Sequence, residues 1–582
     1  MLSSKENEFL NHIRSLWLEG DWQGLANLAT DEFVISSAEA CGYIAVALLK
    51  LGKVKEAINY NDKALALGKN KAWMGKVILS GLFDTLAQAS AIQSKYTKAG
   101  EYWKLSAKLA ASKAEWKISA KARSINAIRK MGHSLSNVNF SVFEEVNSKK
   151  RVEIIKKIDL GKAWAGNTIN TVIFRHHAIF TVDEIQYTAF YVNSSILRIV
   201  KRNLQKGIIE KHDIFGNYNI KDAHNAISLG MDRKGFLHIS YDHHGNKLNY
   251  RRSIRPHNIK CWSDILLMTG KNEDRVTYPC FILPTRNTPL LMLYRDGNWK
   301  KGTAYLKYYD ENKETWFDNP EPILSGSEQK PWTSNAYWCH PVINKEGCLH
   351  LAFTWRTDYF SKEELINNID IDYAKSIDAG KSWFSSKNKP FKLPITQVNS
   401  ETVWPISPGS NHINQTSMAL DSKGYPHIAF YADDDDGVTQ YQHLWFDGRV
   451  WQKQQVTDRT KKFRLAGGGT LEIPISRPEI IIDKDDFVYF IYRSQETGQK
   501  LVATCLQPPS YEIQAGNTQV LLDAFVGQAE PIIDRLRWEN DQILSLLVQF
   551  NEQPNGDLKH FDVSSVIQIV DITFNTFVKK DS

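Results

Sequence analysis

The chain of 582 residues lacks most features of secreted, disulfide-bonded or membrane-embedded proteins. Its six cysteines are scattered without a CxxC motif, so a disulfide framework is not expected in so long a chain. Proline is missing from residues 1–135, and no apolar run is long enough to cross a bilayer. The N-terminus, MLSSKENEFLNHIRSLWLEGDW, lacks a basic start followed by an apolar stretch. These absences predict a soluble, cytoplasmic protein without a membrane span.

Charge and aromatic content point towards sugars. The formal net charge is +7, and a mildly basic surface favours polyanions such as acidic glycans or nucleic acid. No run of lysine and arginine with interleaved aromatic residues is present, so a nucleic-acid partner is not expected. The 17 tryptophans, 23 tyrosines and 26 phenylalanines are typical of β-rich carbohydrate-active proteins. The length predicts two or more structural units.

Residues 1–135 have a helical pattern rich in alanine, leucine and lysine. Around residues 43–66, small and large apolar residues recur at helical spacing on both sides of Gly52. This segment resembles a tetratricopeptide repeat, and weaker copies precede and follow it. Its packing positions are Ala57, Tyr60 and Ala64. We expect an all-α domain of about three hairpins that binds a protein partner; a plain helical bundle is the alternative.

Residues 136–150 are polar and are interpreted as a linker, after which residues 151–582 change in texture. Valine, isoleucine, tyrosine and tryptophan become frequent, in short alternating runs that predict strands. One unit recurs, consisting of a strand, a tight Asp/Gly turn and a second strand. Its copies are MDRKGFLHIS (231–240), INKEGCLHLA (343–352), LDSKGYPHIA (420–429) and the degenerate IDKDDFVYFI (482–491).

Repeated hairpins at these spacings predict an all-β propeller of about seven four-stranded blades. Residues 376–383, SIDAGKSW, fit the Asp-box pattern S-x-D-x-G-x-x-W, a turn device of β-propellers that we interpret as purely structural. A β-sandwich is the competing fold, and it accounts less well for the repeated hairpin.

Histidine, tyrosine and arginine occur at the ends of four strand-like runs, where a rigid β-scaffold presents reactive side chains. These residue types can remove a proton, donate one and neutralise a carboxylate. A lyase that cleaves a uronic-acid polymer needs those three operations. The runs are DAHNAIS (222–228), YDHHGN (241–246), VTYP (276–279) and YRDG (294–297).

These motifs and several others resemble, in order, the BNR-repeat propeller proteins, a family that includes ulvan lyases and rhamnosyl-glucuronate lyases. The resemblance covers most of residues 160–500 and implies a propeller fold with lyase activity. The matching segments are 172–191, HN (224–225), MTG (268–270), RVTYP (275–279), YRDG (294–297), NAY (335–337), WR (355–356), IDYAKS (371–376), NQT (414–416) and SRPE (476–479).

Carried over by motif, the resemblance implies a catalytic site at His244, Tyr278, His224 and Arg295. Arg295 would bind the uronate carboxylate with two prongs, and His244 and Tyr278 would be the base and acid. Which of the two is the base depends on the stereochemistry at C5. We expect four further residues to bind substrate: Tyr337, Asn225, Arg356 and His243.

Other histidines have a structural interpretation. His238, His350 and His427 occupy the same position of the repeated hairpin, which favours a role in packing. Tyr278 precedes Pro279, so we expect its backbone to be extended, and it could be a core aromatic residue.

No metal or cofactor is expected. Relatives of this kind can carry a structural zinc on His and Cys ligands, and Cys339, His340 and His350 are available. The stretch that follows Trp355-Arg356, however, contains no Cys or His. The acidic run of residues 433–436 lacks the spacing of a calcium loop.

The sequence therefore favours a polysaccharide lyase acting on an acidic glycan by β-elimination, in bacterial capsule or exopolysaccharide metabolism. Three alternatives stay open. A uronate C5-epimerase would share the deprotonation step. A sialidase-like glycoside hydrolase would need three arginines around a carboxylate, for which Arg295, Arg356, Arg477 and Arg493 are available. A non-catalytic glycan-binding or scaffold protein would use the same cluster without turnover.

Overall fold

The structure is a computed structural model that describes residues 4–112, 115–133, 149–326, 335–357, 365–513, 516–556 and 561–577. It divides into two compact units. One comprises Met1–Ser148 with Val578–Ser582, and the other comprises Lys149–Phe577. The predicted linker, residues 136–150, lies outside the described residues except for its last two, which begin the first strand.

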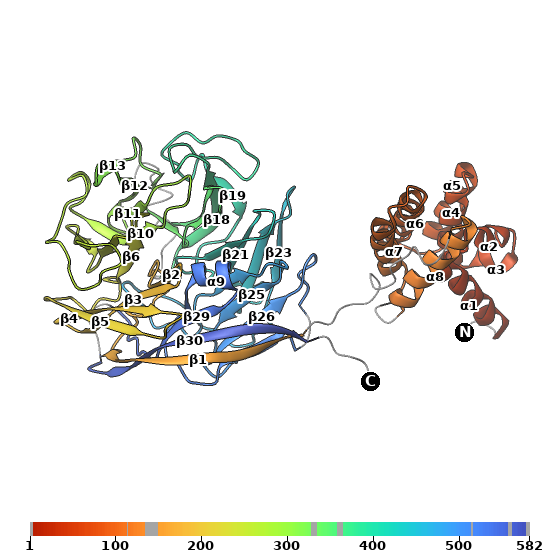
Figure 1. The fold of residues 1–582 in the computed structure, drawn as a ribbon. Coiled ribbons are helices and arrows are strands. Elements are labelled where there is room, and N and C mark those ends of the chain that lie inside the picture. The colour runs from red at the N-terminus through yellow and green to blue at the C-terminus, as the bar shows by residue number, and fades with distance from the viewer. Residues whose placement is uncertain are drawn as a thin grey trace. The chain divides into compact units, whose positions relative to one another are not determined.

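The first unit is helical, as its alanine-rich, proline-free sequence predicts (Figure 1). None of its described helices combines the length and the apolarity that crossing a lipid bilayer requires. That its hairpins are tetratricopeptide repeats stays a prediction. Its helices are α1 (Ser4–Glu19), α2 (Trp22–Asn27), α3 (Glu32–Ser36), α4 (Ala38–Lys50), α5 (Val54–Ala66), α6 (Lys71–Ile92), α7 (Tyr96–Ala110) and α8 (Trp116–Lys130).

Two features explain the packing of these helices. Gly52 has φ +78° at the turn between α4 and α5, a conformation that glycine adopts without strain. Around Trp103 of α7, the small side chains of α6, α7 and α8 let the helices approach closely. That cluster comprises Ala87, Ala91, Ala99, Trp103, Ala107, Trp116, Ala120, Ala127 and Ile128.

The second unit is a β-propeller whose described strands form seven sheets, which confirms the predicted fold. Each sheet is antiparallel, and the hydrophobic clusters lie between neighbouring sheets. In chain order, the first sheet contains β2 (Ile179–Val182), β3 (Ile185–Asn193), β4 (Ile196–Asn203) and β5 (Ile209–Phe215), and the second contains β6 (Ser228–Met231), β7 (Leu237–Ser240) and β9 (Tyr250–Arg252). The third contains β8 (His244–Asn246), β10 (Val276–Ile282), β11 (Leu291–Gly297), β12 (Gly302–Asp310), β13 (Thr315–Asp318) and β14 (Leu324–Ser325). The fourth contains β15 (Asn335–Trp338), β16 (Val342–Ile343), β17 (Leu349–Arg356), β18 (Asn368–Ser376) and β19 (Glu401–Trp404).

The remaining three sheets complete the ring. The fifth contains β20 (Ser417–Leu420), β21 (Pro426–Asp433), β22 (Thr439–Phe446) and β23 (Trp451–Gln455). The sixth contains β24 (Glu479–Ile482), β25 (Val488–Tyr492), β26 (Leu501–Leu506) and β27 (Thr518–Leu522). The seventh contains β28 (Ile532–Ile533), β29 (Leu544–Gln549), β30 (Ser564–Phe577) and β1 (Lys149–Trp164), with helix α9 (Arg535–Asp541) between β28 and β29.

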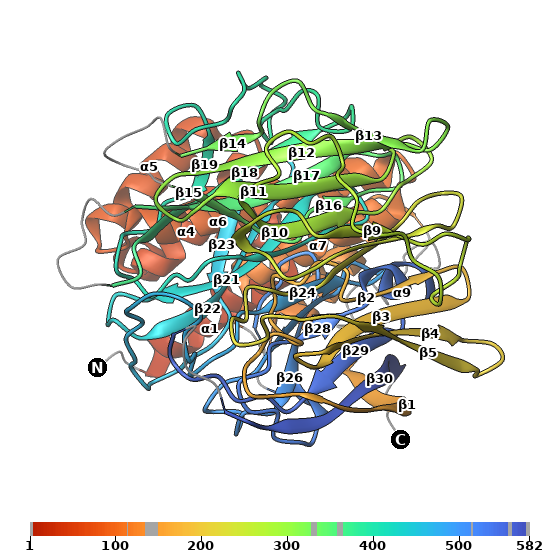
Figure 2. The ribbon, with the colours of Figure 1, turned by 90° about the vertical axis from the view of Figure 1, so that its left-hand side faces the viewer.

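The propeller closes by joining its first strand to its last sheet. Strand β1 pairs with β30 along its whole length, and the two lie side by side in Figures 1 and 2. Buried charges support this sheet, since the Asp571 carboxylate of β30 accepts hydrogen bonds from Arg202 and Arg537 at 2.7 and 2.6 Å. Without this pairing, one long edge of β1 and the facing edge of β30 would both stay unpaired.

The repeated hairpin has one turn chemistry. The first turn residue accepts a hydrogen bond from the backbone N–H four residues later, at 2.7–2.9 Å in each copy. The left-handed position of the turn is Gly235, Gly347 and Gly424 in three copies, and Asp486 in the degenerate fourth. The motif seen in the sequence is therefore a turn that four of the seven sheets share. The hydrogen-bond acceptors are Asp232, Asn344, Asp421 and Asp483.

Candidate functional site

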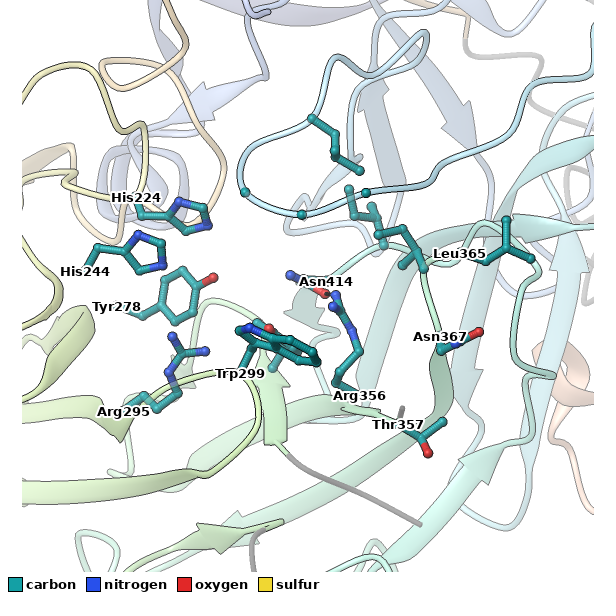
Figure 3. Close-up of a pocket in the computed structure, with 17 residues that line it drawn as sticks. His224, His244, Tyr278, Arg295, Trp299, Arg356, Thr357, Leu365, Asn367 and Asn414 are labelled. Carbon is teal, nitrogen blue, oxygen red and sulfur yellow. Dashed lines mark hydrogen bonds between the residues drawn. The ribbon is translucent and has the colours of Figure 1, made fainter. Parts of the chain in front are cut away.

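The propeller contains a cavity of about 570 Å³, and most of the predicted site residues line it (Figure 3). Six of the eight predicted residues line it: His224, His244, Tyr278, Arg295, Tyr337 and Arg356. They come from three sheets or the loops before them, so no single motif builds the site. The other lining residues are Trp299, Thr357, Leu365, Ile366, Asn367, Ile413, Asn414, Gly467, Gly468, Gly469 and Leu471.

Strand register aligns two of the catalytic candidates. Thr277 of β10 is paired with His244 of β8 on one side and with Arg295 of β11 on the other. Adjacent strands lie about 4.8 Å apart, so the three residues form one row across the sheet. The row explains how residues 51 positions apart in sequence reach the same cavity wall.

A β-bulge directs Tyr278 away from this row. The pairing of β10 with β11 shifts between Thr277 and Cys280, and Tyr278 has φ +54°. The expectation of an extended backbone before Pro279 is therefore wrong, because the bulge outweighs the local preference. A left-handed conformation at a bulky residue is strained, and such strain clusters at functional sites. Figure 3 shows the Tyr278 ring between the imidazoles and the Arg295 guanidinium.

One carboxylate holds both site histidines. Asp222 accepts hydrogen bonds from Nδ1 of His224 at 2.8 Å and from Nδ1 of His244 at 2.5 Å, and the rings stack at 4.1 Å. Burial opposes ionisation of Asp222, but these bonds outweigh it and hold its pKa well below the usual range. Because the carboxylate accepts at Nδ1, each neutral ring has its lone pair on Nε2. His244 is the more accessible, with 34% of its side chain exposed against 11% for His224.

Arg295 is a buried cation set at the cavity wall. It is 2% exposed, and its Nε and Nη1 atoms have no hydrogen-bond partner among the residues that the structure describes. Its guanidinium carbon lies 5.0 Å from the centre of the Tyr278 ring. Gly302 makes room for it, since a Cβ there would come within 2.8 Å of Arg295 Cδ. Buried charges are normally paired, so this arrangement suits an anionic ligand.

A second arginine, Arg356, and a tyrosine, Tyr337, continue the wall of the cavity. Arg356 donates to Asn368 Oδ1 at 2.6 Å and to Asn414 Oδ1 at 2.8 Å, which fixes its guanidinium. Its guanidinium carbon lies 5.2 Å from the Tyr337 ring centre. Burial raises the pKa of the Tyr337 hydroxyl, but the charges of Arg356 and Arg295 outweigh it, so the net pKa is lowered. The two guanidinium groups therefore favour the ionised form of the Tyr337 hydroxyl relative to a buried tyrosine without them.

Two predicted substrate-binding residues do not reach the cavity. His243 is fully buried, and its Nε2 atom lies 3.1 Å from both Ser240 Oγ and the backbone nitrogen of Asn249. Burial lowers the pKa of His243 to about 4, so the ring is neutral. Asn225 is also buried and donates to the Asn219 carbonyl at 2.7 Å. Both residues brace the loops that carry His224 and His244 instead of facing the ligand space.

The structure adds residues that the sequence did not single out. Asp222 lies within a quoted motif but was not assigned a role. Trp299 lies in the β11–β12 turn and is 44% exposed at the cavity edge, where an indole can stack on a sugar ring. Asn367 has a buried Nδ2 without a partner among the described residues. Residues 467–469, three glycines, form a rim whose only sequence signal is their composition.

Among the described residues, one group could hold a metal ion. The ligand atoms of Asp222, His224 and His244 all lie within 4.8 Å of one another. The same atoms form the hydrogen bonds between the carboxylate and the imidazoles, so a metal would replace two protons. The zinc ligands considered from sequence, Cys339, His340 and His350, form no such group among the described residues, and His350 Nδ1 lies 2.7 Å from the Tyr373 hydroxyl.

Sequence comparisons support the resemblance. Residues 185–459 match the model of the BNR repeat-containing family. An ulvan lyase of Alteromonas sp. (strain LOR) is 21% identical over 258 residues, which is 40% of this chain and 52% of that protein. An ulvan lyase of Nonlabens ulvanivorans is 21% identical over 285 residues, or 43% and 57% of the two chains. The chain thus spans about half the length of these curated relatives.

Solved structures show the same fold. Polysaccharide lyase Uly1 superposes with a TM-score of 0.53 at 13% identity, covering 72% of this chain and 99% of that one. A PL25 ulvan lyase bound to GlcA(1-4)Rha3S superposes with a TM-score of 0.50 at 15% identity, covering 68% and 97%. These similarities, together with the seven sheets, confirm the predicted BNR-type propeller.

Proposed function

We propose that the chain is a polysaccharide lyase that cleaves a uronic-acid-containing acidic glycan by β-elimination. The observation that carries the proposal is the buried Arg295 guanidinium. Its Nε and Nη1 atoms have no hydrogen-bond partner among the described residues, and it lies beside Tyr278 and an aspartate-held histidine pair within one cavity. The cavity volume falls in the range of ligand-binding sites.

Arg295 supplies the first requirement of the reaction. In a 4-linked uronate, removing the C5 proton places negative charge on the neighbouring carboxylate. A guanidinium can bind both carboxylate oxygens and stabilise that charge, most strongly where water is excluded. Because Arg295 is already desolvated and has no described counter-charge, it binds such a carboxylate without first breaking an ion pair.

His244 and Tyr278 complete the elimination. The base takes the C5 proton, the electron pair of that bond forms the C4=C5 double bond, and the C4–O4 bond breaks. The acid protonates the departing O4 oxygen, so charge and atoms balance. We assign His244 Nε2 as base and the Tyr278 hydroxyl as acid; with the opposite C5 stereochemistry the two exchange roles.

The surrounding residues position this pair. Asp222 fixes the tautomer and orientation of His244, as carboxylates do for catalytic histidines. His224 and Tyr337 assist or bind, Arg356 offers a second cation to an acidic polymer, and Trp299 offers a stacking surface.

The substrate class rests on the relatives. The sequence relatives are named ulvan lyases, and one structural neighbour holds a glucuronate–rhamnose-sulfate ligand. We extend to this chain only an acidic, uronic-acid-containing polysaccharide. A role in capsule or exopolysaccharide metabolism, and a protein partner for the helical hairpins, remain predictions from sequence.

The test is absorbance near 235 nm, where a 4,5-unsaturated uronate absorbs. The purified chain would be incubated with ulvan, rhamnose–glucuronate polymers and bacterial capsular and exopolysaccharides. A rise that disappears in Tyr278→Phe supports elimination and names the substrate. Absence of a rise on every polymer, together with absence of binding to any of them, would overturn the proposal.

The same samples separate the alternatives. Incorporation of deuterium at C5 from D₂O without a 235 nm rise would indicate an epimerase, and binding without either signal would indicate a non-catalytic module. A sialidase-like site is less well supported. Of its candidate arginines, Arg477 is paired with Glu530 at 2.5 Å and Arg493 bonds backbone carbonyls, while Arg295 and Arg356 line the cavity.

A further inference from the structure

Positive charge in the helical unit is concentrated in its last hairpin. Residues 95–130 contain ten lysines and arginines against two acidic residues, Glu101 and Glu115. Residues 1–94 contain nine basic and ten acidic residues, so that part is nearly neutral. The hairpin of α7 and α8 therefore carries an excess of eight positive charges within 36 residues. One of these, Arg123, is buried in the helical core and does not contribute to the surface.

Three lysines from the two helices meet around one indole. The Nζ atoms of Lys104, Lys108 and Lys117 lie 5.8, 5.0 and 5.8 Å from the ring centre of Trp116. Trp116 is itself 5% exposed, so these lysines surround a packed side chain. The three side chains therefore bring positive charge to one part of the α7–α8 pair.

The positive surface continues along the hairpin. Lys98 lies over Tyr102 one turn earlier on α7, and Lys121 is exposed one turn later on α8. From Lys98 to Lys108 the helix rises about 15 Å, which is too long for a single small anion. An extended polymer with repeated negative charges matches this length. Because lysine is a flexible point charge without a fixed fork, the surface suits many spacings of carboxylate or sulfate.

We propose that this α7–α8 surface is a second binding site for the acidic polysaccharide, separate from the propeller cavity. The identity of the polyanion rests on the proposed function, whereas the surface itself rests on charge and geometry. Since both sites belong to one chain, a polymer that engages both is held more tightly than an oligosaccharide that engages one. The helical unit would then retain substrate between cleavage events.

The experiment compares two triple charge reversals in the full chain. The test variant is Lys104→Glu/Lys108→Glu/Lys117→Glu. The matched control reverses three exposed lysines of α5 and α6, Lys55, Lys71 and Lys76, and changes the net charge equally. Both are made in a Tyr278→Phe background so that the polymer stays intact. Binding to long ulvan and to a short ulvan oligosaccharide is measured at two salt concentrations, and circular dichroism checks folding.

We expect the test variant to bind long ulvan about tenfold more weakly and with less salt dependence, because three side chains that attracted the anionic polymer now repel it. The control should bind like the parent. Equal affinity of the test and control variants for the long polymer would overturn the inference.

Two further probes address other polyanions, because Leu105 and Ile118 are exposed beside these lysines. If anionic phospholipid vesicles or double-stranded DNA bind more tightly than ulvan, and lose binding in the test variant, the surface belongs to a membrane or nucleic acid instead. The binding assay does not depend on turnover. A lyase that fails the absorbance test and a hairpin that fails to bind are therefore distinguishable.

Discussion

The histidines at the cavity and the histidines inside the blades use one side chain in opposite ways. His224 and His244 share a carboxylate and border a space large enough for a ligand. Inside the blades, His238 and His350 each bond a tyrosine hydroxyl at 2.7 Å, and His427 bonds another histidine at 2.9 Å.

The difference lies in the partner and in access. Burial lowers the pKa of His350 and His427 to about 3, so both rings stay neutral and serve as fixed hydrogen-bonding spacers. At the cavity, an ionised aspartate faces both rings and can stabilise the positive charge that arises when a ring takes a proton. Histidine in this propeller is therefore a candidate base only where a carboxylate and a ligand space coincide.

The largest expected effect tests the cavity side of this comparison. His244→Ala and Tyr278→Phe should each reduce turnover by about 10²- to 10⁴-fold, the range for general acid–base groups. Tyr278→Phe keeps the ring that packs edge-on against Phe174 at 5.1 Å, so its melting temperature should stay near the parent value. Kinetics at 235 nm and thermal unfolding check both statements. Retained activity in both variants would remove the proposed site.

Arg295→Lys sharpens the comparison by keeping the charge and removing the fork. A lysine cannot bind both carboxylate oxygens in the plane of the group, so we expect turnover to fall by about 10²- to 10³-fold, as for loss of an oxyanion-stabilising donor. Steady-state kinetics on the cleaved polymer provide the measurement. A variant within threefold of the parent would show that charge alone suffices.

His350→Ala should show the reverse behaviour. Removing the ring leaves a cavity and strands the Tyr373 hydroxyl, which costs about 2 kcal/mol. Chemical denaturation should register this loss, while kcat on the polymer stays unchanged because the residue is remote from the lining of the cavity. If activity fell without loss of stability, the division between the two groups of histidines would be wrong.

The smallest expected effect is a pH dependence of stability. Like the histidines, the carboxylates differ between the blade interior, where Asp372 lies, and the cavity, where Asp222 holds the two histidines. Burial raises the pKa of Asp372 to about 6, whereas the pKa of Asp222 is lowered. An unfolded aspartate loses its proton near pH 4, so the folded state binds more protons between about pH 4 and 6. Stability should therefore fall as pH rises through that window.

Asp372→Asn should abolish this slope while keeping an acceptor for the Trp355 indole N–H, which now lies 2.6 Å from the carboxylate. Unfolding free energies of both proteins at pH 4, 5, 6 and 7 provide the test. Parallel curves for the parent and the variant would contradict the raised pKa.

Much of this architecture could be predicted from local sequence. The four repeated hairpin motifs correctly predict repeated turns, because each turn is built from residues that are neighbours in the sequence. The chemistry-bearing residues stand at the ends of strands, and six of the eight do meet at the cavity. Adjacent histidines were the weak point. His243 lies just before β8 and is fully buried, whereas His244 begins that strand and lines the cavity, so only one of the two reaches the ligand space.

Other features depend on contacts between distant segments. The bulge at Tyr278 arises from the pairing of β10 with β11, and no property of residues 276–279 alone requires it. The sharing of Asp222 by two histidines joins residues 22 positions apart. The glycine rim at residues 467–469 approaches His224 across more than 240 residues of chain. The last of these relations exists only once the ring is closed.

That closure has a consequence for biosynthesis. Strand β1 emerges first, but its partner β30 follows about 400 residues later, a delay of roughly 20–80 s at 5–20 residues per second. During that time one long edge of β1 is unpaired and the propeller cannot form a ring. The helical unit closes over a shorter range, since α8 contacts α1 through residues 101 positions apart, the Ser119 hydroxyl donating to the Leu18 carbonyl. A nascent chain of this protein therefore carries a finished helical module ahead of an open, aggregation-prone sheet, and chaperone demand falls on the second unit.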